Sequence, residues 1–181
     1  MSRLPADLGE GVVLRRHEME DLDALWAAIE AERARIGVWM PWVEGALTID
    51  DERRWLEGVV ADERSLEGCG VWVRAEFAGG VGLMFRDPWG VSGELGYWLV
   101  SEHEGRGLAT RACRALIDIG FRELGLHRLS IRAGVENVRS RAVAERLGFR
   151  QEGIERGACR GSSGFYDLVV YGLLEEEWRR A

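Results

Sequence analysis

The feature that most constrains this chain is a glycine loop, EGRGLAT, at residues 104–110. An apolar run, GELGYWLV, precedes it at 93–100, and a helical pattern follows from about 108 to 124. Glycine permits the tight turn that leads a strand into a helix. The unpaired amides and the dipole of a helix N-terminus also attract phosphate. The loop therefore predicts a strand-to-helix turn that is either an ordinary connection or a phosphate site.

The segments around this loop predict an α+β fold. Apolar spacing indicates strands at 11–17, 69–76, 81–86, 93–100, 127–133, 149–156 and 165–174, and helices at 19–33, from 48 to about 60, 108–124 and 137–149. Turns are expected at FAGG, residues 77–80, and at DPWGVS, residues 87–92. A strand meander followed by a strand–helix–strand unit favours one mixed, mostly antiparallel sheet of about six to seven strands flanked by helices, in a single domain over 1–181.

Composition excludes several function classes. The formal net charge is −7, which disfavours nucleic acid as a partner and tolerates a cationic substrate such as an amine. No apolar stretch approaches the length of a membrane span, and the N-terminus has no secretory pattern. The three cysteines, Cys69, Cys113 and Cys159, lack metal-type spacing, so we expect free thiols in a cytoplasmic protein without a metal.

The absence of lysine narrows the reading of the glycine loop, because all 24 basic residues are arginine. A nucleotide triphosphatase loop needs a lysine, so that class is excluded. A dinucleotide site fits GRGLAT poorly, since Thr110 stands where glycine or alanine is usual and four polar residues separate the strand from Gly105. An acyl-CoA pyrophosphate needs only the backbone amides of residues 105–110 and the helix dipole.

Five segments together resemble one family, the GNAT N-acetyltransferases, in its RimJ/RimL-like branch. The loop EGRGLATRA resembles the family's pyrophosphate loop, and NVRSRAVAERLGF resembles the N-x-x-S motif that follows it. ELGYWLV, VWMPWV and FYDLVVYGLLEEEW resemble the family's fourth strand, a substrate segment of this branch and its C-terminal strand. The five matches stand in the family's order and cover most of the chain, and they imply the GNAT fold.

The resemblance implies acetyl-CoA as the cosubstrate, with its pantetheine arm along the fourth strand. The residues implied to contact it are Leu99, Val100, Gly105, Arg106, Gly107, Leu108, Ala109, Thr110, Asn137 and Ser140. Arg111, Arg139 and Arg141 are further cations that could meet its phosphates. Glu104 departs from the Gln or Arg of many members, so we expect its carboxylate to point away from the pyrophosphate. Asn137, the single asparagine of the chain, would cap the short helix and bond the pantetheine amide.

Two residues are candidates for the chemistry of acetyl transfer. Glu94 matches the glutamate base of related histone acetyltransferases, with Glu136 and an exposed His103 as alternatives. Ser140 lies at the position nearest the CoA sulfur and would donate a hydrogen bond to the thiolate as it leaves. The tyrosine that serves many members as general acid is replaced by Ala144. A backbone N–H near Leu99 would polarise the thioester oxygen.

The acceptor side is expected in an aromatic, irregular segment. Trp39, Met40 and Trp42 would wall the acceptor site, and Tyr166 and Asp167 would face the same cleft. The branch favours a protein N-terminal α-amine, with a small-molecule amine such as a polyamine or aminoglycoside as the alternative. A non-catalytic acyl-CoA-binding module and a nicotinamide-dependent oxidoreductase are the other classes. Members of this branch often form dimers, so the resemblance also implies a homodimer.

Overall fold

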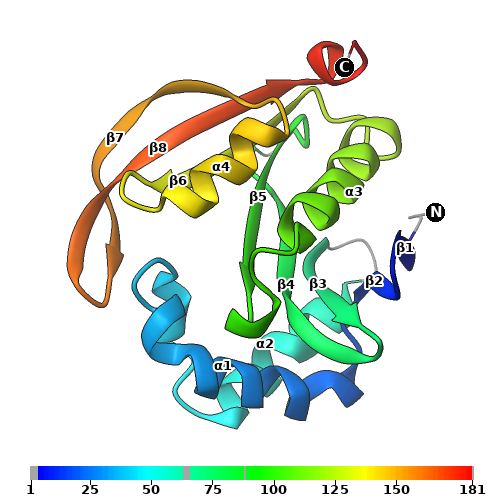
Figure 1. Cartoon of the computed structure of the whole chain (residues 1–181), viewed down its shortest axis with the longest axis vertical. Helices are drawn as coiled ribbons and strands as arrows, with labels where there is room; N and C mark the ends of the chain where they lie inside the picture. The colour runs from blue at the N-terminus through cyan, green and yellow to red at the C-terminus, as the bar shows by residue number, and fades with distance from the viewer. Residues whose placement is uncertain (1–3, 63–65, 88, 181) are drawn as a thin grey trace.

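The described residues, 4–62, 66–87 and 89–180 of a computed structural model, contain one eight-stranded sheet (Figure 1). The strands are β1 Ala6–Gly9, β2 Val12–Arg16, β3 Leu66–Val73, β4 Glu76–Phe85, β5 Ser92–Leu99, β6 Arg128–Gly134, β7 Arg150–Gly161 and β8 Gly164–Leu174. Their order across the sheet is β1-β2-β3-β4-β5-β6-β8-β7, and every neighbouring pair is antiparallel except β5 and β6. The α+β class is confirmed, and the sheet is one strand larger than expected.

The extra strand is β1, a four-residue edge strand that pairs with β2. Its sequence, ADLG, is short and carries no run of β-branched or aromatic residues that would mark a strand. The connection between β4 and β5 at residues 86–91 is where DPWGVS predicts a turn, although Pro88 lies outside the described residues.

The turn expected at FAGG is wrong, because residues 77–80 lie inside β4. The chain instead turns at Arg74 and Ala75, whose φ angles of 49° and 70° suit a tight hairpin without any glycine. The glycines of β4 allow close packing against neighbouring residues. A Cβ on Gly80 would lie 2.7 Å from Trp98 Nε1, and one on Gly82 would lie 2.4 Å from the Glu67 carbonyl oxygen.

Helices cover both faces of the sheet. Helices α1 to α4 begin within three residues of the positions predicted from the sequence. The helices are α1 Leu22–Ile36, α2 Ile49–Ala61, α3 Leu108–Arg122, α4 Val138–Arg146 and the short α5 Glu175–Trp178, with 3-10 turns η1 Met19–Asp21, η2 Pro41–Glu44 and η3 Ser101–His103. The capping box of Thr48 and Asp51 is confirmed at the start of α2. No helix in the described ranges is both long and apolar enough to span a membrane.

The two faces of the sheet carry different environments. Leu95 on β5 and Leu116 on α3 belong to the large apolar core that α3 and α4 share with one face. The other face packs against α1 and α2, where Leu25, Trp72 and Phe77 form a small apolar cluster. In Figure 1, α1 and α2 lie together at the lower end of the molecule, and α3 and α4 lie above them. Residues of alternate parity along β5 therefore face two different compartments.

Strands β5 and β6 pair over only three residues each. The register runs from Ser92 opposite Arg128 to Glu94 opposite Ser130, and there it stops. Beyond Glu94, β5 stays paired with β4 as far as Leu99, whereas β6 turns its other edge to β8. The sheet therefore opens into a wedge between residues 95–99 and the end of β6, and the site is built around this wedge.

Candidate active site

Backbone groups of β5 line the wedge without a partner strand. The Val100 N–H donates to the Ala78 carbonyl of β4 at 2.9 Å, so Val100 faces β4. Antiparallel pairing alternates in direction, so the N–H groups of Leu99 and Tyr97 face the opposite way, toward the wedge. An extended chain could add to this edge as a further strand. The Leu99 amide is therefore available to such a chain, whereas the Val100 amide is already used by β4.

The glycine loop presents a row of unpaired amides at the N-terminus of α3. The first amide with a backbone acceptor is that of Arg111, which donates to the Gly107 carbonyl at 3.0 Å. Among the described hydrogen bonds, none uses the amides of residues 105–110 as donors. Gly105 and Gly107 have φ angles of 73° and 72°, which direct the loop into the helix and which other residues adopt only with strain. The loop thus has the geometry of an anion-binding nest at a helix end.

The acidic residue of the loop is neutralised by arginine. Glu104 accepts from Arg35 Nη1 at 2.5 Å and also pairs with Arg139. These two guanidinium groups offset the carboxylate that would otherwise repel a phosphate beside the loop. The pairing leaves the backbone amides as the loop's donors, as the sequence predicts from the presence of Glu104.

The remaining arginines named from the sequence have protein partners. Arg106 Nη1 lies 3.1 Å from His103 Nδ1, and Arg111 donates to the Leu8 carbonyl. Arg141 donates to the Val135 carbonyl and to the Tyr171 hydroxyl. His103 itself is 5% exposed, so the expectation that it is an exposed loop residue is wrong. It sits in η3, folded under the loop.

Helix α4 brings Asn137 and Ser140 to the wedge. The Asn137 side chain accepts from the Ser140 amide at 3.1 Å and caps the helix. The Ser140 hydroxyl lies 2.9 Å from the Tyr97 hydroxyl, and the Tyr97 hydroxyl also lies 3.0 Å from the Ser140 carbonyl oxygen, to which it donates. Burial raises the pKa of Tyr97, so the phenol stays protonated. Tyr97 and Ser140 therefore form a pair of hydroxyls between β5 and α4.

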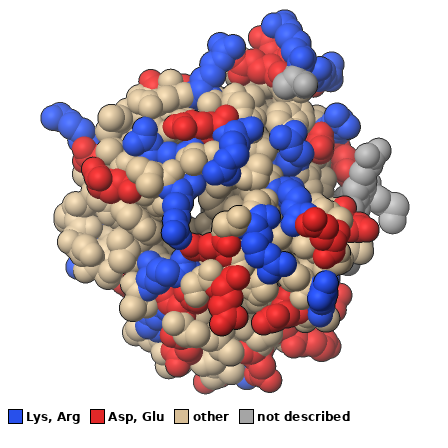
Figure 2. All heavy atoms as spheres, in the orientation of Figure 1, with Lys and Arg blue, Asp and Glu red and all other residues tan. Residues whose placement is uncertain are grey.

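A cavity of about 580 Å³ joins this wedge to the face covered by α1 and α2. Asn137, Ser140 and Tyr97 line it from the α4 side, and Gly82 and Gly96 form part of its floor. These two glycines are paired across β4 and β5, so no side chain stands at that point. Figure 2 shows a hollow near the middle of the face of the molecule that is in view, with both basic and acidic side chains around it.

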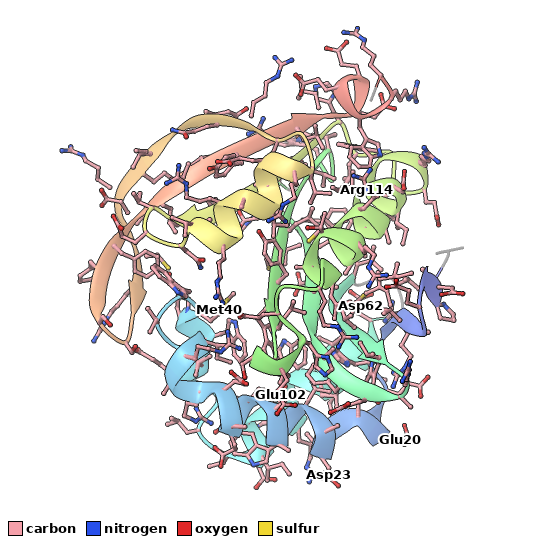
Figure 3. The ribbon with its side chains drawn as sticks, in the orientation of Figure 1. Glu20, Asp23, Met40, Asp62, Glu102 and Arg114 are labelled. Atoms are coloured by element: carbon pink, nitrogen blue, oxygen red, sulfur yellow. The ribbon has the colours of Figure 1, made fainter. Side chains whose placement is uncertain are left out.

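The aromatic segment expected at the acceptor site does line the cavity. Trp39 packs edge-on against Tyr166, with ring centroids 5.5 Å apart, and its carbonyl accepts from the Tyr166 hydroxyl. Trp42 lies 6.1 Å from Trp98 by the same measure. Met40 completes the wall, and Figure 3 places it between the α1 end of the molecule and α4. Four of the five residues predicted for the acceptor side are thus brought together.

The fifth residue, Asp167, does not line the cavity. Neighbouring residues of a strand point to opposite faces, so Asp167 points away from the side that Tyr166 occupies. Its carboxylate accepts from the Gly157 amide at 2.8 Å and supports the irregular part of β7. Glu136, named as an alternative base, is exposed and also lies outside the cavity lining.

Glu94 lies on the cavity wall with two arginines bound to it. Its Oε2 accepts from Arg86 Nε and from Arg132 Nε, both at 2.9 Å, and its Oε1 lies 2.8 Å from Arg86 Nη2. A carboxylate oxygen can accept two hydrogen bonds, so Oε1 keeps room for one more donor. The arrangement can hold a water or an amine there.

Tyr97 and Glu52 are cavity residues that were not named from the sequence. Tyr97 could have been found by strand alternation, because it follows Leu95 on the α4 side of β5. Glu52 shares the buried stripe of α2 with Leu56 and Val59, at positions i, i+4 and i+7, and a carboxyl in such a stripe is unusual. Burial raises the pKa of Glu52 to about 7.

Comparisons with known proteins show which family and which relatives the chain is similar to. Residues 12–150 match the family described as the acetyltransferase (GNAT) domain. The chain is 36% identical over 177 residues to the putative ribosomal N-acetyltransferase YdaF of Bacillus subtilis (strain 168), covering 94% of this chain and 95% of that protein. It is 28% identical over 135 residues to the ribosomal-protein-serine acetyltransferase of Escherichia coli (strain K12), covering 74% of this chain and 75% of that one.

Solved structures show the same fold. A crystal structure described as a probable acetyltransferase superimposes with a TM-score of 0.86 at 34% identity, over 96% of this chain and 98% of that chain. RimL, the ribosomal L7/L12 α-N-protein acetyltransferase, solved in complex with coenzyme A, superimposes with a TM-score of 0.87 over 94% of this chain and 98% of that chain. At 21% identity the second likeness establishes the fold alone.

Proposed function

This chain belongs to the GNAT acetyltransferase family, and from that premise we propose that it transfers the acetyl group of acetyl-CoA to a primary amine. The N-terminal α-amine of a protein is the acceptor we propose, because relatives named as ribosomal-protein acetyltransferases cover most of the chain. We propose the whole chain, 1–181, as one catalytic domain. Its cytoplasmic location and its homodimer stay predictions.

One observation carries the proposal: a single cavity joins the wedge beside β5 and the start of α4 to an aromatic and acidic compartment against α1 and α2. The amides of residues 105–110 fit a pyrophosphate, since a helix N-terminus binds an anion without lysine or metal. No group of side chains in the described residues could hold a metal ion. We therefore propose phosphate binding at the loop, outside the cavity lining, and amine binding in the aromatic compartment of the cavity.

The chemistry assigned to the residues follows from their positions. Acetyl-CoA supplies the thioester, whose C–S bond breaks as the acceptor's N–C bond forms, and the amine loses one proton. The Leu99 N–H faces the wedge and would stabilise the thioester oxygen as charge builds on it. Ser140, next to Tyr97, would donate a hydrogen bond to the departing sulfur. Asn137 would bond the pantetheine amide from the start of α4.

For the proton we propose Glu94, reached through a water at the open site of Oε1. Arg86 and Arg132 hold the carboxylate in place and leave that oxygen accessible to the cavity. The position of Glu94 supports this role, because the residue lies on the acceptor side of β5 at the point where the wedge begins.

A small-molecule amine is the second candidate acceptor. The cavity is partly roofed by η2, and its volume is within the range of small-ligand sites. Three aromatic side chains, Trp39, Trp42 and Trp98, enclose it more than a flat protein-binding surface would require. A peptide N-terminus would have to enter as an extended chain.

Calorimetry and a thiol-release assay test the proposal. We expect acetyl-CoA and CoA to bind with a Kd on the order of micromolar, and NAD not to bind. Peptides with free N-termini and small polyamines are then compared as acceptors by the CoA they release. Binding of NAD without CoA would support an oxidoreductase. Tight CoA binding with no turnover of any amine would leave a non-catalytic binding module.

A further inference from the structure

Glu52 is a buried carboxyl without a counter-charge. Its residue is 5% exposed, and burial is the only influence on its pKa, with no ionic or hydrogen-bonding partner among the described residues. An ionised carboxyl in such a place is costly unless a cation joins it. It lies on the core-facing stripe of α2 and lines the cavity directly.

The other acidic and basic side chains that line the same cavity lie beside groups of their own. They are His17, Asp51, Glu67, Glu94 and Arg132. His17 Nδ1 lies 3.5 Å from Asp21 Oδ2, Asp51 caps α2 and pairs with Arg54, and Glu67 has an interaction of its own. Glu94 and Arg132 bind each other. Glu52 is therefore the cavity carboxyl whose charge no described residue balances.

Aromatic rings line the same cavity as Glu52. Trp55, three residues along α2, lies 6.1 Å from the His17 ring by centroid, and His17 lies 5.8 Å from Phe77. Phe77 in turn lies 5.7 Å from Trp98. Aromatic faces attract organic cations, and they attract them more strongly where water is excluded. A carboxylate among such rings suits an ammonium carried on an apolar chain.

We propose that Glu52 is the acceptor-binding residue of this enzyme, and that it holds the positive charge of an alkylammonium acceptor inside the aromatic part of the cavity. This inference rests on the proposed function and adds a specificity-determining residue to it. The role is binding: Glu52 attracts and places the ammonium form of the acceptor. The nitrogen gives one proton to water before it attacks the thioester, and the second proton, released as the N–C bond forms, passes to Glu94. An acceptor without a positive charge leaves Glu52 unbalanced and is rejected.

A binding measurement tests this without requiring turnover. Calorimetry at pH 8 compares n-hexylammonium with 1-hexanol, which share a chain length and differ in charge, on CoA-saturated protein. We expect the wild type to bind hexylammonium at least about tenfold more tightly than hexanol, and E52Q to lose that preference. E57Q is the matched control, because Glu57 is exposed on the same helix. Equal preference in E52Q and wild type would overturn the proposal.

Steady-state kinetics give the second readout, with whichever amine the acceptor screen identifies. We expect E52Q to raise the acceptor KM by about tenfold or more and to leave kcat within about threefold. A lower kcat at unchanged KM would contradict a binding role. If no amine is acetylated by any variant, the proposed function fails, and the calorimetry still decides the role of Glu52. A melting temperature for E52Q at or above that of the wild type shows that the variant is folded.

Discussion

At the scale of single residues, the hydroxyl pair of Tyr97 and Ser140 leads to a prediction about how the thiolate leaves. Ser140→Ala removes the hydroxyl that we propose faces the sulfur, and we expect kcat to fall by about tenfold or more. Acetyl-CoA affinity should stay within about twofold, since the loop amides are untouched. Rates of thiol release and a CoA titration measure the two quantities. A wild-type kcat in this variant would leave Ser140 as a plain helix residue.

Tyr97→Phe tests the partner of that serine. The variant keeps the buried ring and loses both hydrogen bonds to Ser140. We expect the free energy of unfolding to fall by about 1 kcal/mol, because a buried hydrogen bond is lost and the Ser140 groups lose a partner. The kcat should fall less than in Ser140→Ala, since Tyr97 acts by orienting the serine. Chemical denaturation and steady-state kinetics check both. A larger loss of kcat than in Ser140→Ala would contradict this order.

Glu52 makes the stability of the protein depend on pH. Burial raises its pKa in the folded protein to about 7, above the ordinary glutamate value that the unfolded chain keeps. The folded state therefore holds its proton more tightly, and stability falls as pH rises from about 4.5 to 7. We expect E52Q to be more stable than wild type by about 2 kcal/mol at pH 8 and equal to it near pH 4.5. Denaturation curves at the two pH values, with E57Q as the control, measure this. A gain of the same size at both pH values would contradict this cause.

At the scale of elements, two glycine substitutions at opposite ends of α3 distinguish the effect of backbone strain from the effect on ligand binding. Gly107→Ala forces a non-glycine residue into a φ of 72° at the start of α3, which costs about 1 kcal/mol and disturbs the amides beside it. We expect the Kd for acetyl-CoA to rise by about tenfold. Gly125→Ala is the control, because Gly125 has a similar φ of 68° and equally open surroundings beyond the other end of α3. It should lose similar stability and keep its acetyl-CoA affinity. Equal losses of affinity would refute an anion site at the loop.

The helices and the glycine loop could be predicted because their signals are local. The capping pair Thr48 and Asp51, and Asn137 before α4, are each read within four residues of sequence. The hairpin between β3 and β4 could not be predicted, because Arg74 and Ala75 form the turn. The nearby glycines instead leave room for Trp98 and for the Glu67 backbone. A glycine is a poor signal for a turn where it is needed instead for close packing against a residue distant in the sequence.

At the scale of the whole molecule, the wedge between β5 and β6 decides which residues meet. The resemblance named Ser140, Asn137 and the aromatic segment, and these residues do line the cavity. It could not show that Tyr97 touches Ser140, which depends on how α4 sits over β5. Nor could it show that Glu52 has no counter-charge, because that depends on every element around the cavity. Contacts between distant segments carry no pattern in the sequence.

Gly96, on the floor of the cavity, lies between its two ends and is the subject of the last prediction. Gly96→Ala adds a methyl group on the acceptor side of β5, where its nearest neighbour would be Met84 Cε at 3.5 Å, an ordinary contact. We expect a folded variant whose acceptor KM rises by about fivefold, because the methyl narrows the space between the wedge and Glu52, and whose acetyl-CoA affinity is unchanged. Gly153→Ala, on β7 and outside the cavity lining, should alter neither. Acceptor kinetics and acetyl-CoA calorimetry on both variants measure the separation. If Gly96→Ala weakened acetyl-CoA binding as much as acceptor binding, the cavity would be a single compartment, and the division of the site into a cofactor end and an acceptor end would fail.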